Sequence, residues 1–134
     1  MMLRMGFDQY HEPPDELPQE TRTFARLCAS LTEEAEAIGW YAQRIAVESD
    51  REARSIMLDA MGEEFKHFAM DLEFLLRRTP LWREIAEGIL FTEGDIVEHG
   101  EEAEESAVEG AAERGAPLVG STSLGIGSLK GAAS

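Results

Sequence analysis

Large apolar side chains recur every three or four residues between positions 21 and 47. The members of this stripe are Phe24, Leu27, Leu31, Glu34, Ile38, Tyr41 and Ile45. Such spacing puts side chains on one face of an α-helix, so it predicts a long amphipathic helix from Thr21 to about Val47. Glu34 is unusual because it is an acid in the middle of an otherwise apolar stripe.

A second helix is predicted from about Arg51 to Thr79, after a polar break at residues 48–50. Its stripe consists of Met57, Met61, Glu64, Phe68, Leu72 and Leu75. Ser49 and Asp50 are both candidates for the N-cap of this helix. Pro80 is expected to end it, because proline is poorly tolerated in a helix interior.

Beyond Pro80 the pattern weakens. A short third helix is predicted from about Leu81 to Phe91. Residues 93–113 contain nine acidic and no basic residues and few large apolar ones, which predicts a solvated segment, either disordered or a weakly held helix. Past Arg114 the composition turns to Gly, Ser, Ala and Pro, as in flexible linkers, until a last small apolar cluster near the end of the chain.

These patterns predict an all-α chain in four parts. Residues 1–19 are expected to form a flexible arm, and residues 20–95 a helical hairpin domain of two long antiparallel helices plus a short third helix. Residues 96–120 are expected to form an acidic and Gly/Ser linker that is disordered. Residues 121–134 form a separate C-terminal segment.

Charge and cysteine content narrow the possible functions. The chain of 134 residues has a formal net charge of −15, with 27 acidic and 12 basic residues. An acidic surface argues against binding to nucleic acids and anionic membranes and favours cations as ligands. No apolar run is long enough to span a bilayer, and the N-terminus lacks a signal-peptide core, so we expect a cytosolic location. The single cysteine, Cys28, excludes an internal disulfide and is expected to pack as a small apolar residue.

The two stripe glutamates predict a metal site. A buried carboxylate is costly unless a cation or a hydrogen-bond donor meets it. In a hairpin that turns at Ser49, Glu34 lies 15 residues before the turn and Glu64 lies 15 after it, so the two acids face each other. His67 follows Glu64 by three residues, close enough on a helix to bind the same ion. The alternative is that each glutamate is a solvated acid beside the stripe.

Three ligands from one hairpin make only half of a di-iron site. Di-iron carboxylate bundles use a Glu from each of two helices and a Glu-x-x-His from each of the other two. This chain has one copy of each, and a two-fold dimer would supply the second. The sequence therefore predicts a four-helix bundle that is completed only on dimerisation. Carboxylates and imidazole without thiolates suit iron or manganese.

Further polar and aromatic residues flank this cluster. Glu33 and Glu36 are neighbours on the surface of the first helix and are candidates to attract divalent cations, with an ordinary acidic face as an equal alternative. Tyr41 lies in the stripe and is a candidate to hydrogen-bond a ligand carboxylate and orient it, although it and Trp40 are equally suited to a plain packing role.

Three segments together carry a family resemblance. They are Glu33-Glu34-Ala35-Glu36-Ala37-Ile38-Gly39-Trp40-Tyr41, Gly62-Glu63-Glu64-Phe65-Lys66-His67-Phe68-Ala69-Met70 and Leu90-Phe91-Thr92-Glu93-Gly94. In these segments the chain resembles the encapsulated ferritins, over about residues 20–95. The resemblance implies a ferritin-like hairpin domain, a ferroxidase centre formed across a dimer interface, and assembly of dimers into an open ring, typically a decamer.

The resemblance also assigns residues. It implies metal ligands at Glu34, Glu64 and His67, metal-uptake acids at Glu33 and Glu36 that could also hold calcium or another divalent cation, and supporting aromatics at Trp40 and Tyr41. Members of the family carry a histidine near the uptake site, where this chain has Asp59.

The C-terminal segment resembles a second family feature. Leu124-Gly125-Ile126-Gly127-Ser128-Leu129 is similar to the short peptide by which cargo proteins dock inside encapsulin shells. Leu124, Ile126 and Leu129 would be its three apolar contacts. Residues 121–134 are therefore expected to bind an encapsulin shell protein, with the random end of a Gly/Ser-rich tail as the alternative.

The resulting hypothesis is a ferroxidase, with iron at a di-iron centre between two subunits, that feeds iron storage inside an encapsulin nanocompartment of a bacterial or archaeal cytoplasm. One rival is a non-catalytic cargo or scaffold protein that dimerises and binds cations weakly. A second rival is a rubrerythrin-like peroxide reductase, which the absence of a Cys-rich electron-transfer module disfavours.

Overall fold

The structure is a computed structural model that describes residues 9–115. Over this range the chain is helical and contains no strand. A 3-10 turn at Pro14–Glu16 is followed by four α-helices, α1 (Gln19–Val47), α2 (Arg51–Arg78), α3 (Pro80–Glu87) and α4 (Ile96–Glu113). None of the helices in this part of the chain is long and apolar enough to cross a membrane.

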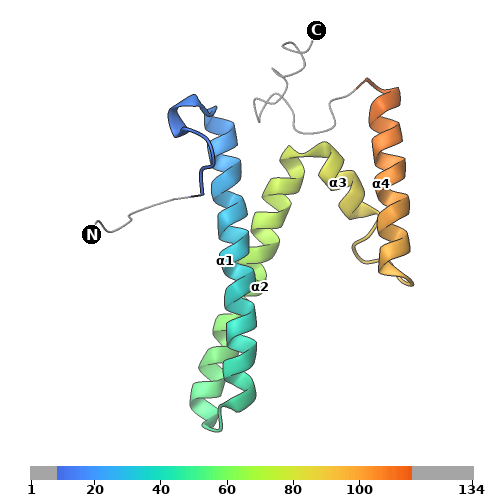
Figure 1. Ribbon diagram of the computed structural model, residues 1–134. Coiled ribbons are helices and arrows are strands. Elements are labelled where there is room, and N and C mark those ends of the chain that lie inside the picture. The colour runs from blue at the N-terminus through green and yellow to red at the C-terminus, as the bar shows by residue number, and fades with distance from the viewer. Residues whose placement is uncertain (1–8, 116–134) are drawn as a thin grey trace. The chain divides into compact units, whose positions relative to one another are not determined.

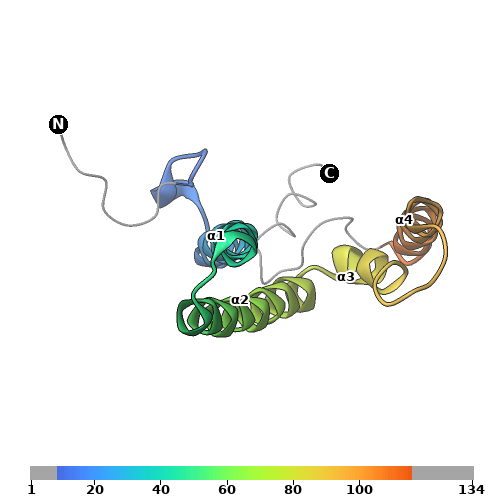
Figure 2. The same ribbon diagram turned by 90° about the horizontal axis from the view of Figure 1, so that it is seen from below.

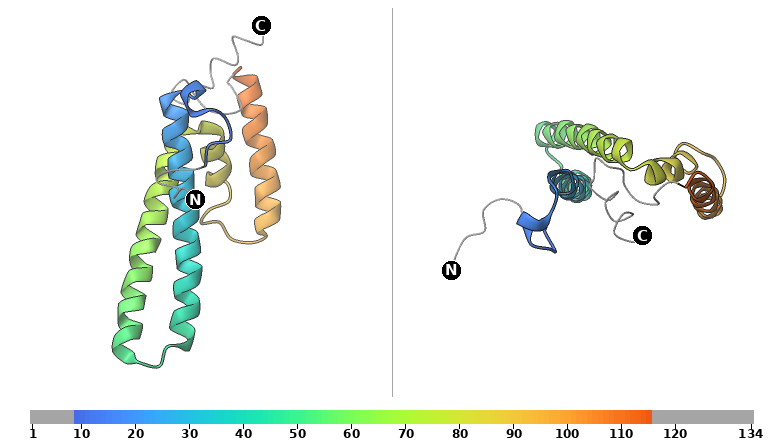
Figure 3. Two further views of the ribbon diagram at one scale, coloured as in Figure 1. Left: turned by 60° about the vertical axis from the view of Figure 1, so that its left-hand side comes forward. Right: turned by 90° about the horizontal axis from the view of Figure 1, so that it is seen from above.

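Helices α1 and α2 form the predicted hairpin, and they run side by side in opposite directions (Figures 1 and 3). Asp50 is the N-cap of α2, because its Oδ1 accepts a hydrogen bond from the Ala53 backbone N–H at 2.8 Å. Across the turn, Arg54 Nε donates to the Ile45 carbonyl at 3.3 Å. Viewed nearly down α1, α2 lies obliquely, so the two axes cross rather than stay parallel (Figure 2).

The hairpin has a thin core. Ile45, Leu75 and Leu76 are the buried apolar residues of α1 and α2, and only Leu75 is fully buried. Other large apolar side chains stay open to solvent, with 52% of Trp40, 52% of Phe65 and 58% of Met70 exposed. Two antiparallel helices cannot cover both of their apolar faces, so one chain leaves apolar surface available to a partner.

Helices α3 and α4 pack against each other in a second compact unit (Figure 1). Pro80 is the first residue of α3, a position where its missing N–H costs nothing. It follows the end of α2 at Arg78 by two residues. Helix α3 ends at Glu87, earlier than the predicted Phe91. The chain then turns, and Phe91 and Gly94 take positive φ angles of 62° and 96°, which cannot continue a right-handed helix.

Of the two forms expected for residues 93–113, a disordered segment or a weakly held helix, the structure shows a helix, and it corrects the assignment of residues 96–120 to a disordered linker. Residues 96–113 are helical, and residues 116–120 lie outside the described range. The Asp95 side chain caps α4 by accepting from the Glu98 N–H at 2.9 Å. Ala107 and Ala111 are buried along one face at a four-residue spacing. The ion pair between Arg114 and Glu84, at 3.1 Å, ties the end of α4 to α3.

Candidate metal centre

Glu34 lies on α1, and its carboxyl group interacts with acidic side chains of α2. Burial raises the pKa of its carboxyl to about 7, with further contributions from a side-chain hydrogen bond to Asp71 and from the negative charges of Asp71, Glu64 and Glu33. Its Oε2 is buried and has no hydrogen-bond partner. The carboxyl group therefore lies where a proton or a cation would be strongly favoured.

Glu64 and His67 form a second group on α2. His67 Nδ1 lies 3.6 Å from Glu64 Oε1, as expected for side chains three residues apart on a helix. His67 Nε2 is 4.0 Å from Glu63, which in turn pairs with Lys66 at 2.7 Å. The Lys66 ammonium lowers the pKa of Glu63 through this hydrogen bond and through its positive charge. The exposed Glu63 carboxylate therefore already has a cationic partner. Glu64 is the more shielded acid, with 23% of its side chain exposed against 53% for Glu63.

Asp71 is a residue that sequence reasoning missed. It lies seven residues after Glu64 and four after His67, on the same face of α2. The structure brings it against Glu34, and its Oδ2 is buried without a hydrogen-bond partner. The seven-residue spacing from Glu64 is a usable signal, but Asp71 is not a member of the predicted stripe, in which Leu72 follows it directly.

These side chains do not by themselves surround an ion. Among the described residues, no group of three or more His, Cys, Asp or Glu side chains is placed to hold a metal. The cluster supplies carboxylate oxygens and one imidazole, which suit iron or manganese, and it contains carboxylate oxygens that lack partners. The donor set fits a divalent cation, provided that further ligands come from outside this chain.

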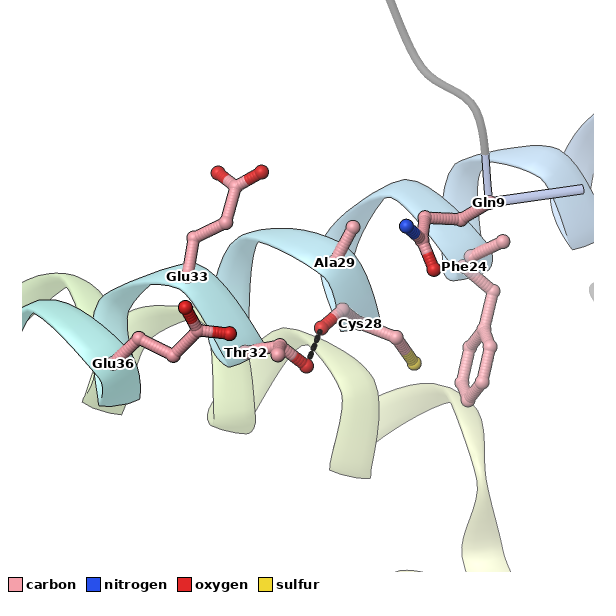
Figure 4. Close-up of a pocket in the computed structure, with 8 residues that line it drawn as sticks. Gln9, Phe24, Cys28, Ala29, Thr32, Glu33 and Glu36 are labelled. Carbon is pink, nitrogen blue, oxygen red and sulfur yellow. Dashed lines mark hydrogen bonds between the residues drawn. The ribbon is translucent and has the colours of Figure 1, made fainter.

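Glu33 and Glu36 lie on a different face of α1. Both are exposed, and they line the edge of an open pocket of about 420 Å³ together with Cys28 and Thr32 (Figure 4). In the same picture the two carboxylates lie at one end of the pocket, and Thr32 donates a hydrogen bond to the Cys28 carbonyl at 3.0 Å. Burial raises the pKa of the Cys28 thiol. The two acids are thus more exposed than Glu34, although the charge of Glu33 contributes to the raised pKa of Glu34.

The two candidate aromatics have different surroundings. Trp40 is half-exposed, and its indole is not enclosed by the hairpin. Tyr41 is less exposed, lies two turns after Glu34, and has the Arg44 guanidinium 5.3 Å from the centre of its ring. Leu124, Ile126 and Leu129 of the C-terminal segment lie outside the described residues.

Comparison with known proteins identifies the family. The model of the EncFtn-like family matches residues 9–93, which include Glu34, Glu64, His67 and Asp71. The chain belongs to the EncFtn-like family. Helix α4 lies beyond the matched residues, so it is an addition to the part that the family model describes.

Curated relatives agree with this placement in the EncFtn-like family. The chain is 44% identical over 126 residues to an encapsulated ferritin-like protein of Rhodospirillum rubrum, covering 92% of this chain and 89% of the relative. It is 45% identical over 95 residues to a ferritin-like protein of Thermotoga maritima, covering 71% of this chain and 83% of the relative.

A solved structure supports the fold. Protein ne0167 of Nitrosomonas europaea matches with a TM-score of 0.64 and 39% identity, covering 66% of this chain and 98% of that one. The helical architecture of this EncFtn-like protein therefore has an experimental counterpart over two thirds of the chain, and the predicted all-α, ferritin-like fold class is confirmed at that level.

Proposed function

We propose that the protein is a ferroxidase that oxidises Fe(II) to Fe(III) at a di-iron centre formed between two subunits. Glu34, Glu64 and His67 of each chain would bind the iron, which is the substrate. We further propose that it works as cargo inside an encapsulin nanocompartment and supplies Fe(III) for storage there.

The observation that carries this proposal is the state of Glu34. Its carboxylate lies between two helices, near Glu64 and Asp71, with a buried oxygen that has no partner. A chain that folded only for stability would gain by an apolar residue at this position. Glu64 and His67, 3.6 Å apart on the facing helix, supply the other donors that iron prefers.

The residues of the chain would act by binding and charge compensation. Fe(II) takes the place of the proton on Glu34, and that proton passes to solvent. The carboxylates stay ionised beside the iron and favour the higher charge of Fe(III), so they assist the loss of one electron from each Fe(II). Dioxygen or a reduced oxygen species accepts the electrons. A neutral His67 imidazole completes the donor set without adding positive charge.

Dimerisation follows from the incomplete ligand set. Each hairpin offers one Glu helix and one Glu-x-x-His helix, half of what di-iron carboxylate bundles use. The exposed Trp40, Phe65 and Met70 provide apolar surface for the second copy. We propose a homodimer that assembles further into a ring-shaped decamer and docks to the shell through residues 121–134.

Glu33 and Glu36 are proposed to collect divalent cations, iron or calcium, on the outer face of α1. Their exposure and their place beside an open pocket support a site of arrival rather than of reaction. Tyr41, on the inner face, is proposed to orient a ligand carboxylate. Trp40 is proposed to support the metal site from the subunit surface.

A second candidate function is a non-catalytic cargo or scaffold that binds cations weakly. The observation in its favour is that no group of three His, Cys, Asp or Glu side chains is placed to hold one ion in the described part of a single chain. The two candidates differ in whether a pair of chains accelerates iron oxidation over buffer.

Glu34→Gln tests the ferroxidase. This change keeps the size of the side chain and removes its charge, so we expect the initial rate of Fe(II) oxidation, followed by ferric absorbance, to fall more than about tenfold. Glu52→Gln, at the exposed first turn of α2, makes the same change away from the cluster and serves as the control. An unchanged rate in Glu34→Gln, or a wild-type rate no greater than that of buffer, would sink the proposal.

A further inference from the structure

Asp71 has no role in the ligand set of two glutamates and one histidine, yet it occupies the same interface. Its carboxyl group lies within hydrogen-bonding range of Glu34, from the facing helix. Asp71 Oδ2 and Glu34 Oε2 are both buried and both lack a partner. Carboxylate oxygens only accept hydrogen bonds, so these two oxygens can be satisfied only by a proton or a cation placed between them.

The position of Asp71 along α2 is equally specific. Glu64, His67 and Asp71 are spaced by three and four residues, so all three lie on one face and within two turns. Glu34 faces this row from α1, close enough that both Asp71 and Glu64 act on its charge. Removal of Asp71 would leave Glu34 with fewer acceptor oxygens around the same buried point.

We infer that Asp71 is a further carboxylate ligand of the candidate metal centre, and that it binds a divalent cation together with Glu34 of its own chain. This inference rests on the proposed function of that site. A cation between the two carboxylates binds both unpaired oxygens at once and offsets the repulsion between the two negative charges. Each chain then offers four ligand side chains, Glu34, Glu64, His67 and Asp71.

A cost accompanies this arrangement when metal is absent. When both carboxylates are ionised in this partly buried interface they repel each other, so the metal-free hairpin is then less stable than it would be with a neutral residue at Asp71. The inference therefore predicts opposite effects of Asp71→Asn on metal binding and on metal-free stability. A residue with a purely structural role would not show this opposition.

Binding of Mn(II) alone tests the inference without any turnover. The full-length protein is stripped of metal, and free Mn(II) is followed by electron paramagnetic resonance during titration. Asp71→Asn is expected to weaken Mn(II) binding at least about tenfold, while Asp71→Glu, which keeps the carboxylate, recovers most of the affinity. Glu52→Gln is expected to bind as the wild type does. The melting temperature of metal-free Asp71→Asn is expected to equal or exceed that of the wild type.

The outcomes separate the inference from the proposed function. If Asp71→Asn binds Mn(II) like the wild type while Glu34→Gln does not, Asp71 is not a ligand and the proposed function stands. If Glu34→Gln also binds like the wild type, the proposed function itself fails. If Asp71→Asn does not fold, Asp71→Ser is measured in its place and decides in the same way.

Discussion

At Glu34, burial and the charges of neighbouring acids both disfavour the ionised carboxylate. Its carboxyl is held near other acids between two helices, and its pKa is raised to about 7. Near neutral pH the group is therefore divided between protonated and ionised forms in the metal-free chain. A cation that arrives at the site therefore displaces a proton rather than breaking an established ion pair.

The stability of the metal-free protein should depend on pH through Glu34. Because the pKa of the folded state lies above the ordinary value of 4.5, the folded chain binds this proton more tightly than the unfolded chain. The resulting stabilisation is complete below about pH 4.5 and is lost as pH rises through about 7. We expect the free energy of unfolding of the metal-stripped protein to fall by on the order of 1 kcal/mol between pH 5 and 8, after allowance for solvent screening.

Glu34→Gln provides the control for this pH dependence. The amide does not titrate, so denaturant unfolding of the variant should show a shallower fall over the same range. Equal slopes for the two proteins would mean that Glu34 is ionised throughout and that its surroundings do not hold the proton.

The individual site residues could be found from the sequence only in part. Glu34 stands out because it interrupts an apolar stripe, and Glu64 with His67 has a spacing that helices turn into neighbours. The spacing of Asp71 places it on the face of Glu64 and His67, but its contact with Glu34 depends on how α1 and α2 cross. Periodicity predicts the face of a helix, whereas contacts across a hairpin also depend on the crossing angle.

Among the elements, the α3–α4 pair is held together by small residues. A Cβ placed on Gly88 would lie 2.6 Å from the Ala103 Cβ, so the backbone of the α3 C-cap lies directly against α4. Ala107 and Ala111 continue the contact surface along α4. Close approach of this kind depends on the absence of side-chain volume.

Gly88→Ala should therefore loosen this pair. The added methyl group has to displace Ala103, and we expect a loss of about 1–3 kcal/mol in the free energy of unfolding, measured by denaturant titration. Gly39→Ala in α1 is the matched control, because nothing lies within 4 Å of its added Cβ and alanine favours helix. Similar stabilities for the two variants would show that α3 and α4 do not pack through Gly88.

Helix α4 is predicted less well from the sequence than the two long helices are. The two long helices and their turn follow from strong periodicity, and their ends agree to within two residues of the observed Gln19–Val47 and Arg51–Arg78. In α4 the buried side chains are alanines, which give little hydrophobic signal, while many glutamates dominate the composition. The acidic composition predicted a solvated segment, but Asp95 and the small-residue face supply a cap and a packing surface.

At the scale of the whole molecule, one chain is an incomplete unit. Its hairpin buries few apolar side chains fully and leaves Trp40, Phe65 and Met70 half-exposed. Within residues 9–115, its acids approach each other without three His, Cys, Asp or Glu side chains being placed to hold one ion. A second hairpin would complete both, because it would cover the apolar faces and supply the other half of the ligands.

Native mass spectrometry of the full-length protein tests this central claim most directly. Samples purified without metal and samples loaded anaerobically with Fe(II) are compared for assembly mass and bound metal. We expect iron to be found in assemblies with an even number of chains, at about two Fe(II) per pair of chains, and not in single chains. Single chains that bind iron to the same extent, or assemblies that hold none, would contradict the account.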